Sequence, residues 1–289
     1  MLLSSDISKA GLCEIGHTAR IKQYPGGSWE LMAASEAIWR DAGWEARERS
    51  GRGGGRSPEA AKAADGDSRS QRRARSALRD KALCTPMRYF VTLTLSPQLV
   101  DDRHDIGALV KLLRVWLDNR VRRKGLAYVL VPERHKDGAL HLHGLITGGV
   151  DLRDSGTIKP PAGGKPRRPR SARQRAAWLA DGGQIVYNVV DWPYGFSTAL
   201  ELRGDYDAAV GYVCKYIGKE SEKIGGRWYF SGGALGAPVI TYCDVSFTEA
   251  AEAAGAYVTE ISCGERYGFA LAIVRGKGDV RLERRHNDQ

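Results

Sequence analysis

Residues Glu133–Gly144, with the sequence ERHKDGALHLHG, predict a β-hairpin that presents two histidines on one face. Lys136-Asp137-Gly138 supplies the tight turn, because Asp and Gly tolerate the positive φ angles that hairpin turns require. Side chains alternate between the faces of a strand, so His141 and His143 point one way while their neighbouring leucines point into a core. Glu133 precedes the turn and brings a carboxylate to the same place. This set suits a metal ion, although an ordinary edge strand with hydrogen-bonded histidines would show the same spacing.

The composition favours a polyanionic partner. The chain has 289 residues, 42% of them hydrophobic, and carries a net charge of +10 with a pI of about 9.4. Such a charge favours nucleic acid, although a merely soluble basic protein would also carry it. The five cysteines are scattered without a C-x-x-C pair, which argues against a thiolate zinc site or a disulfide framework and fits a reducing cytoplasm. We expect no signal peptide and no membrane span, because no apolar run approaches about 20 residues.

Composition changes along the chain predict four regions. They are an N-terminal accessory segment (1–45), a flexible basic linker (46–82), a folded domain (83–243) with a basic insertion at about 157–183, and a small α/β C-terminal extension (244–289). Apolar residues from Trp29 to Trp39, with Trp44 beyond, hint at a short amphipathic helix in the first region. The linker is rich in Gly, Ser, Ala and Arg and has almost no large apolar side chain, so we expect it to stay unfolded, with or without contact to DNA.

The domain reads as an α+β pattern. Alternating β-branched and aromatic residues predict strands, and apolar residues at helical spacing predict helices. The expected order is a strand over 88–95, a helix over 105–124, a strand over 127–131, the hairpin, strands over 184–192 and 196–202, and a helix over 205–220.

The last of these helices carries a candidate nucleophile. Helical spacing places Tyr212, Tyr216, Lys215 and Lys219 on one face, opposite an apolar face that includes Val213. An ordinary amphipathic helix would also fit. A phenol has a pKa of about 10, so it needs a base, a cation or a metal-polarised substrate to become a nucleophile. The lysines would favour phenolate and offset phosphate charge, and a metal held by the hairpin would polarise a phosphodiester.

The helix and the hairpin together make the two halves of a DNA-cleaving transesterase. The mixed nitrogen and oxygen donors of His141, His143 and Glu133 are compatible with Mg²⁺, Mn²⁺ or Zn²⁺, and the absence of thiolate favours Mg²⁺ or Mn²⁺. His135 falls on the same face as Glu133 and is a competing ligand.

Three blocks in order resemble the motifs of the HUH endonuclease superfamily, in its rolling-circle replication initiator (Rep) branch. They are Phe90–Thr94 (FVTLT), His141-Leu142-His143 preceded by Glu133, and Tyr212–Lys219 (YVCKYIGK). The third block is similar to the two-tyrosine form of single-stranded DNA phage and plasmid initiators. The resemblance covers about Met87 to Glu220.

The resemblance implies both a fold and a reaction. The fold is a five-stranded antiparallel sheet flanked by helices, with the histidines on a central strand and the tyrosine helix nearby. The reaction is nicking of single-stranded DNA at an origin through a 5′-phosphotyrosine bond, which frees a 3′-OH for a DNA polymerase in the cytoplasm of a bacterial host. No G-x-x-x-x-G-K-[ST] motif occurs, so a host helicase is expected to unwind the DNA.

Alternative functions remain at the level of sequence. A relaxase or transposase of the same superfamily is one, but most conjugative relaxases place the tyrosine ahead of the histidines. A non-catalytic nucleic-acid-binding module is another, with aromatic residues of the sheet stacking on bases, but it leaves the histidines and tyrosines unexplained. The twin spacing Tyr212–Lys215 and Tyr216–Lys219 leaves open which tyrosine cuts first.

Overall fold

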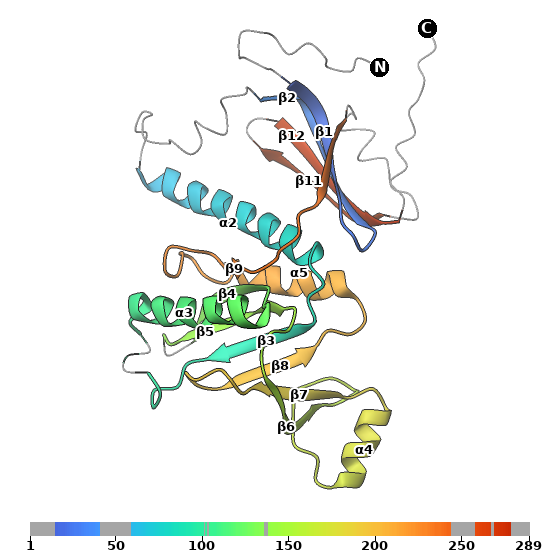
Figure 1. The fold of residues 1–289 in the computed structure, drawn as a ribbon. Helices are drawn as coiled ribbons and strands as arrows, with labels where there is room; N and C mark the ends of the chain where they lie inside the picture. The colour runs from blue at the N-terminus through green and yellow to red at the C-terminus, as the bar shows by residue number, and fades with distance from the viewer. Residues whose placement is uncertain are drawn as a thin grey trace. The chain divides into compact units, whose positions relative to one another are not determined.

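The chain divides into two compact units in the computed structural model (Figure 1). The structure describes residues 15–40, 59–100, 102, 104–135, 138–243, 258–266 and 269–278. One unit is Glu59–Ala237, and the other combines Met1–Pro58 with Pro238–Gln289. No helix in the described ranges has both the length and the apolar character needed to cross a membrane.

The unit Glu59–Ala237 is built on a seven-stranded antiparallel sheet. The spatial order is β6-β7-β8-β3-β5-β4-β9. The strands are β3 (Tyr89–Thr94), β4 (Tyr128–Arg134), β5 (Leu140–Ile146), β6 (Leu152–Lys159), β7 (Gln184–Val189), β8 (Ser197–Glu201) and β9 (Phe230–Gly232). The α+β class is confirmed, but the expected count of five strands is wrong because β6 and β9 add one strand at each edge. The supposed inserted loop thus begins as a strand and continues into a helix, α4 (Ala172–Ala180).

Helix α3 (Ile106–Lys124) covers one face of this sheet, as its apolar spacing predicts (Figure 1). Leu113 and Trp116 of α3 join Leu93 of β3 and Leu142 of β5 in one buried cluster. Gly125 ends the helix with a φ of 67°, a left-handed conformation that suits glycine. The leucines of β5 are therefore used by the core, and the alternate residues of β5 face away from α3.

Residues 59–83 correct the predicted flexible linker, because they form helix α2 (Glu59–Leu83). Alanine and arginine favour helix, and Leu78 and Ala82, four residues apart, are fully buried. The helix packs on α5 (Tyr206–Tyr216), and the Gln71 side-chain amide donates to the backbone oxygen of Glu220 at 2.9 Å. The folded unit therefore starts at Glu59, ahead of the expected boundary at 83.

The other unit contains a five-stranded antiparallel sheet of order β10-β1-β2-β12-β11. Its strands are β1 (Ile15–Gln23), β2 (Ser28–Arg40), β10 (Val239–Cys243), β11 (Val258–Arg266) and β12 (Phe269–Lys277). The expected helix near Trp29 is wrong: Trp29, Leu31 and Ala33 are buried at alternate positions of a strand. The N-terminal segment and the C-terminal extension are likewise not separate, because β12 pairs with β2. Trp44 lies outside the described residues.

Candidate active site

Strand β5 places both histidines on the face away from α3. It lies between β3 and β4, so His141 sits opposite Thr94 and Glu133, and His143 sits opposite Thr92. Leu140 and Leu142 of the same strand are only 1% exposed on the other side. The alternation predicted from the sequence is confirmed.

The turn that joins β4 to β5 closes at Gly138. Its φ is 82°, and its backbone N–H donates to the carbonyl of His135 at 2.8 Å. The N–H of His135 in turn donates to the carbonyl of Ala139 at 2.8 Å. Lys136 and Asp137, the other two predicted turn residues, lie outside the described residues.

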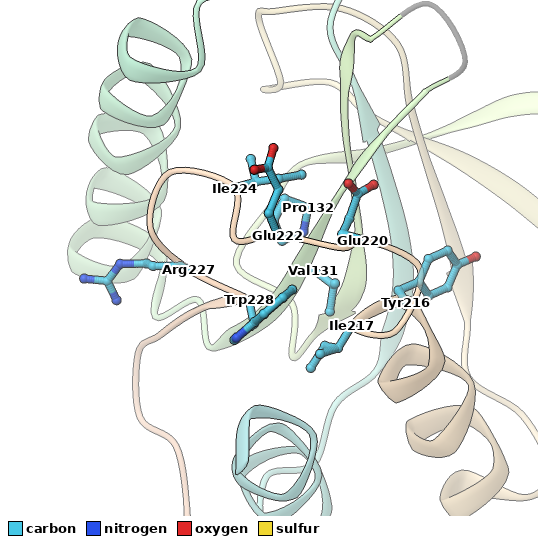
Figure 2. A pocket seen from close by; sticks show the side chains of 9 residues that line it. All are labelled: Val131, Pro132, Tyr216, Ile217, Glu220, Glu222, Ile224, Arg227 and Trp228. Carbon is cyan, nitrogen blue, oxygen red and sulfur yellow. The ribbon is translucent and has the colours of Figure 1, made fainter. Parts of the chain in front are cut away.

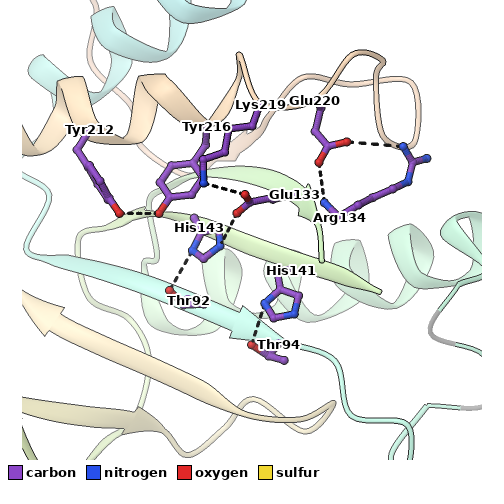
Figure 3. A network of polar contacts seen from close by, with 10 residues as sticks. All are labelled: Thr92, Thr94, Glu133, Arg134, His141, His143, Tyr212, Tyr216, Lys219 and Glu220. Carbon is purple, nitrogen blue, oxygen red and sulfur yellow. Dashed lines mark hydrogen bonds and ion pairs between the residues drawn. The ribbon is translucent and has the colours of Figure 1, made fainter. Parts of the chain in front are cut away.

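Threonines of β3 hold both imidazoles at one ring nitrogen (Figure 3). The hydroxyl of Thr92 lies 3.0 Å from Nδ1 of His143, and that of Thr94 lies 3.3 Å from Nδ1 of His141. Burial lowers the pKa of His143, although the nearby Glu133 carboxylate opposes that shift. A neutral imidazole that donates from Nδ1 keeps a lone pair on Nε2, which is the tautomer that a metal ligand needs.

Glu133 bridges the hairpin and the segment that follows α5. One carboxylate oxygen lies 2.9 Å from Nε2 of His143, and the other accepts from Nζ of Lys219 at 2.8 Å. The side chain of Lys219 is 52% exposed, so solvent screens this ion pair and its main effect is to position the groups. The predicted carboxylate and one predicted lysine therefore meet at His143 (Figure 3).

Helix α5 brings the two tyrosines to the same place. Its first turn is capped by Asp205, whose carboxylate accepts from the N–H of Ala208 at 3.2 Å. Buried Val210 and Val213 fix the rotation of the helix. The hydroxyls of Tyr212 and Tyr216 then lie 2.8 Å apart.

Tyr212 and Tyr216 differ sharply in environment. The ring of Tyr216 stacks on His143 with centroids 4.4 Å apart, and Nζ of Lys219 lies 4.2 Å from its centroid. Tyr216 is 6% exposed and Tyr212 is 51% exposed. Burial, and then the hydrogen bond to Tyr212, raise the pKa of Tyr216 well above the ordinary value of a phenol. A shared solvent-facing surface for both tyrosines is therefore not what the structure shows.

The end of α5 explains this difference. The helix stops at Tyr216, not at Glu220, and residues 217–219 form a turn. That turn brings Lys219 back over the ring of Tyr216. Lys215, the other predicted lysine, is exposed and does not join the polar network that Figure 3 shows.

Some residues near the site were not singled out from the sequence. Thr92 and Thr94 share the face of the histidines, and their alternation on β3 is the signal that would have found them. Glu220 accepts from the backbone N–H of Arg134 at 2.7 Å, which ties the segment after α5 to β4.

A pocket borders Tyr216 on the side of this segment (Figure 2). Its empty volume of about 160 Å³ is small against the roughly 300–1,000 Å³ of ordinary ligand pockets. The pocket is lined by Val131, Pro132, Tyr216, Ile217, Glu220, Glu222, Ile224, Arg227 and Trp228. We therefore place the candidate chemistry on the open face that carries the histidines.

The donor groups can be compared with the needs of a metal ion. No three His, Cys, Asp or Glu side chains among the described residues converge as a ready metal site. The 2.9 Å between His143 and Glu133 nevertheless matches the roughly 3 Å between adjacent ligands with bonds of about 2.1 Å at right angles. His141 lies on the same face, with His135 stacked on it at a centroid distance of 4.8 Å. The donor types and their shared face therefore fit Mg²⁺ or Mn²⁺, with two of the three donors already at ligand spacing.

Comparison with known families supports the resemblance seen in the motifs. Residues 88–221 match the model of a family described as replication-associated protein, of the ORF2 group. The matched range runs from just before β3 to just after α5 and contains every candidate site residue. No curated protein and no solved structure matches the chain. The match supports a rolling-circle replication initiator, and the HUH and two-tyrosine details stay predictions.

Proposed function

We propose that this protein is a metal-dependent HUH endonuclease and strand transferase that nicks single-stranded DNA at an origin and starts rolling-circle replication. The observation that carries the proposal is the polar network of Figure 3. In it, a pair of phenol hydroxyls 2.8 Å apart adjoins an imidazole, a carboxylate and an ammonium group. This network falls inside the range that matches a replication-associated family.

The proposed reaction exchanges one ester bond for another. A tyrosine hydroxyl loses its proton and its oxygen attacks the phosphorus of a DNA phosphodiester. The bond from phosphorus to the 3′ oxygen breaks, and that oxygen takes up a proton and leaves as a free 3′-OH. One phosphodiester is lost and one 5′-phosphotyrosine ester is formed, so the step needs no ATP and rejoining is the reverse reaction.

The residues of this chain have separate tasks in the proposal. His141, His143 and Glu133 would hold Mg²⁺ or Mn²⁺, and a bound ion of this kind supplies Lewis-acid polarisation of a phosphodiester oxygen. Thr92 and Thr94 fix the imidazoles. Lys219 contributes positive charge beside Tyr216, which offsets charge on a phosphate or a phenolate.

The biological setting follows from this reaction. A free 3′-OH would prime a host DNA polymerase, and a host helicase would open the duplex. The second tyrosine would cut after a round of synthesis and permit strand joining. This work would take place in the cytoplasm of a bacterial cell.

Incubation with a single-stranded oligonucleotide of the origin and Mn²⁺ or Mg²⁺ tests the proposal. We expect a covalent protein–DNA adduct that EDTA prevents and that disappears when Tyr212 and Tyr216 are both changed to Phe. His143→Ala should lose cleavage while keeping DNA affinity. An adduct that persists in the double Phe variant would overturn the tyrosine assignment, and equal loss of binding in His143→Ala would make that histidine structural.

A further inference from the structure

A strongly basic segment lies at the sheet edge farthest from α5, and the proposed reaction does not use it. Residues 159–175 contain seven Lys or Arg and no Asp or Glu. We call this segment the basic finger. Its cations are mostly solvent-exposed, with Lys165, Arg168, Arg170 and Arg173 all in the exposed class. Such a density of one charge demands either internal neutralisation or an external anion.

The basic finger has a defined scaffold. Ile158, fully buried, exchanges two backbone hydrogen bonds with Arg167, of 2.9 and 3.0 Å, and these close the loop between them. Ser171 caps α4 by accepting from the N–H of Gln174 at 3.1 Å, and the Gln174 side chain accepts from the N–H of Arg170 at 2.6 Å. The cations are therefore held in place by backbone structure, which lowers the entropic cost of binding a partner.

Internal neutralisation accounts for little of this charge. Arg175 pairs with Asp154, and the guanidinium of Arg167 lies over the ring of Trp178 at 4.9 Å from its centroid. Within the described part of the chain, Lys165, Arg168, Arg170 and Arg173 form no ion pair. Four ordered cations thus face solvent with no carboxylate of the described residues beside them.

The position of the basic finger relative to the histidines suggests what it binds. β6, which leads into it, is four strands from β5 in the sheet order. Four strand spacings of about 4.8 Å give roughly 19 Å. At about 3.4 Å per base pair, that separation corresponds to between five and six base pairs of duplex.

We propose that the basic finger binds the phosphate backbone of duplex DNA that flanks the nicking site, about half a helical turn away. The identity of the polyanion as DNA rests on the proposed function. Duplex is favoured over single-stranded DNA, because single-strand sites need aromatic side chains on which bases stack. The one aromatic residue of α4, Trp178, is only partly exposed and lies under Arg167.

A charge-removal variant with a matched control tests this proposal. The finger variant combines Lys165→Gln, Arg168→Gln, Arg170→Gln and Arg173→Gln. The control removes the same charge from exposed positions of α3, on the face of the sheet opposite the histidines: Lys111→Gln, Arg114→Gln, Arg122→Gln and Arg123→Gln. Fluorescence anisotropy would report the affinity of each protein for a labelled duplex of about 16 base pairs and for an oligo-dT of the same length, over a range of salt.

We expect the finger variant to lose at least about tenfold in duplex affinity at low salt. The slope of log K against log salt should become shallower by up to about 3.6, since each lost phosphate contact removes about 0.9. Oligo-dT affinity should be unchanged, and the control should keep most of its duplex affinity. Equal losses in the finger and control variants, equal losses on duplex and oligo-dT, or no loss at all would each overturn the proposal.

The failure of this proposal is distinguishable from failure of the proposed function. Duplex binding is measured without any cleavage, so a wild-type protein that forms no covalent adduct leaves the finger result intact. Conversely, the finger variant should still form the adduct on a short single-stranded oligonucleotide. Thermal unfolding followed by circular dichroism should give the same midpoint for the wild type and both variants, which establishes that all three are folded.

Discussion

Replacing Tyr216 by Phe removes one hydroxyl, which lies 2.8 Å from the hydroxyl of Tyr212. Tyr212 is half exposed and Tyr216 is buried, so incoming DNA meets Tyr212 first. The pKa of Tyr216 is raised by burial and by this hydrogen bond, which makes Tyr216 the donor and Tyr212 the acceptor. We therefore predict that Tyr212 makes the first cut and that Tyr216 stabilises its phenolate.

The size of the effect follows from the chemistry of that contact. A hydrogen bond to a charged acceptor contributes about 1.5–3 kcal/mol. At about 1.4 kcal/mol for each factor of ten, Tyr216→Phe should slow the first adduct by roughly 10- to 150-fold. Tyr212→Phe should abolish that adduct, because the exposed nucleophile itself is lost.

Single-turnover kinetics, with the adduct resolved on denaturing gels, would measure both variants. Peptide mapping by mass spectrometry would identify the tyrosine that carries DNA in the wild type. Both variants should bind the oligonucleotide as well as the wild type does, since neither loses a cation. A wild-type adduct found on Tyr216, with Tyr212→Phe reacting at the wild-type rate, would refute the reasoning.

Three further predictions concern neighbouring residues. Thr92→Val removes the hydroxyl at an imidazole Nδ1, so calorimetry should show Mn²⁺ affinity about 10- to 100-fold weaker, and unchanged affinity would count against the metal site. Lys219→Gln should slow adduct formation about tenfold or more, from loss of an electrostatic contact beside the phenols, whereas Lys215→Gln should have little effect; equal effects would contradict the assigned roles. Gly144→Ala should destabilise the fold by at least about 3 kcal/mol in urea titrations, because the new Cβ would clash with the backbone oxygen of Val129 on β4. Gly211→Ala has open space and should instead stabilise α5 by about 0.5–1 kcal/mol, and similar losses in both would show that the clash is not the cause.

The elements with strong local patterns were predictable from the sequence. The alternation of β5 places His141 and His143 together, and the helical spacing of α3 gives its buried face. Glu133 was predictable as a partner because a hairpin fixes its register, and it pairs opposite His141 as expected. Local periodicity was sufficient in each case.

The remaining elements depend on contacts distant in sequence. β2 pairs with β12, whose residues lie more than 200 positions further along the chain, so no local pattern reveals the shared sheet. Helix α2 has a narrow buried stripe that includes Leu78 and Ala82, and small side chains give a weak apolar signal. Both segments gain their structure from packing that a single stretch of sequence does not contain.

The tyrosine pair illustrates the same limit at the site. A helix continued to Glu220 would put Tyr212, Tyr216 and Lys219 on one polar face. The helix ends at Tyr216, and the following turn lets Lys219 cover the ring that stacks on His143. The unequal burial of the two tyrosines follows from that ending, which depends on how the segment after α5 is tied to β4.

The polarity of the covalent bond tests the central claim most directly. An origin oligonucleotide would be labelled at its 5′ end in one sample and at its 3′ end in another, then cleaved with Mn²⁺. Attack by tyrosine with loss of the 3′ oxygen predicts that the 3′-end label becomes bound to protein. The 5′-labelled fragment should be released with a 3′-OH that a DNA polymerase extends. Two free fragments with no labelled protein, or transfer of the 5′-end label to protein, would contradict the account.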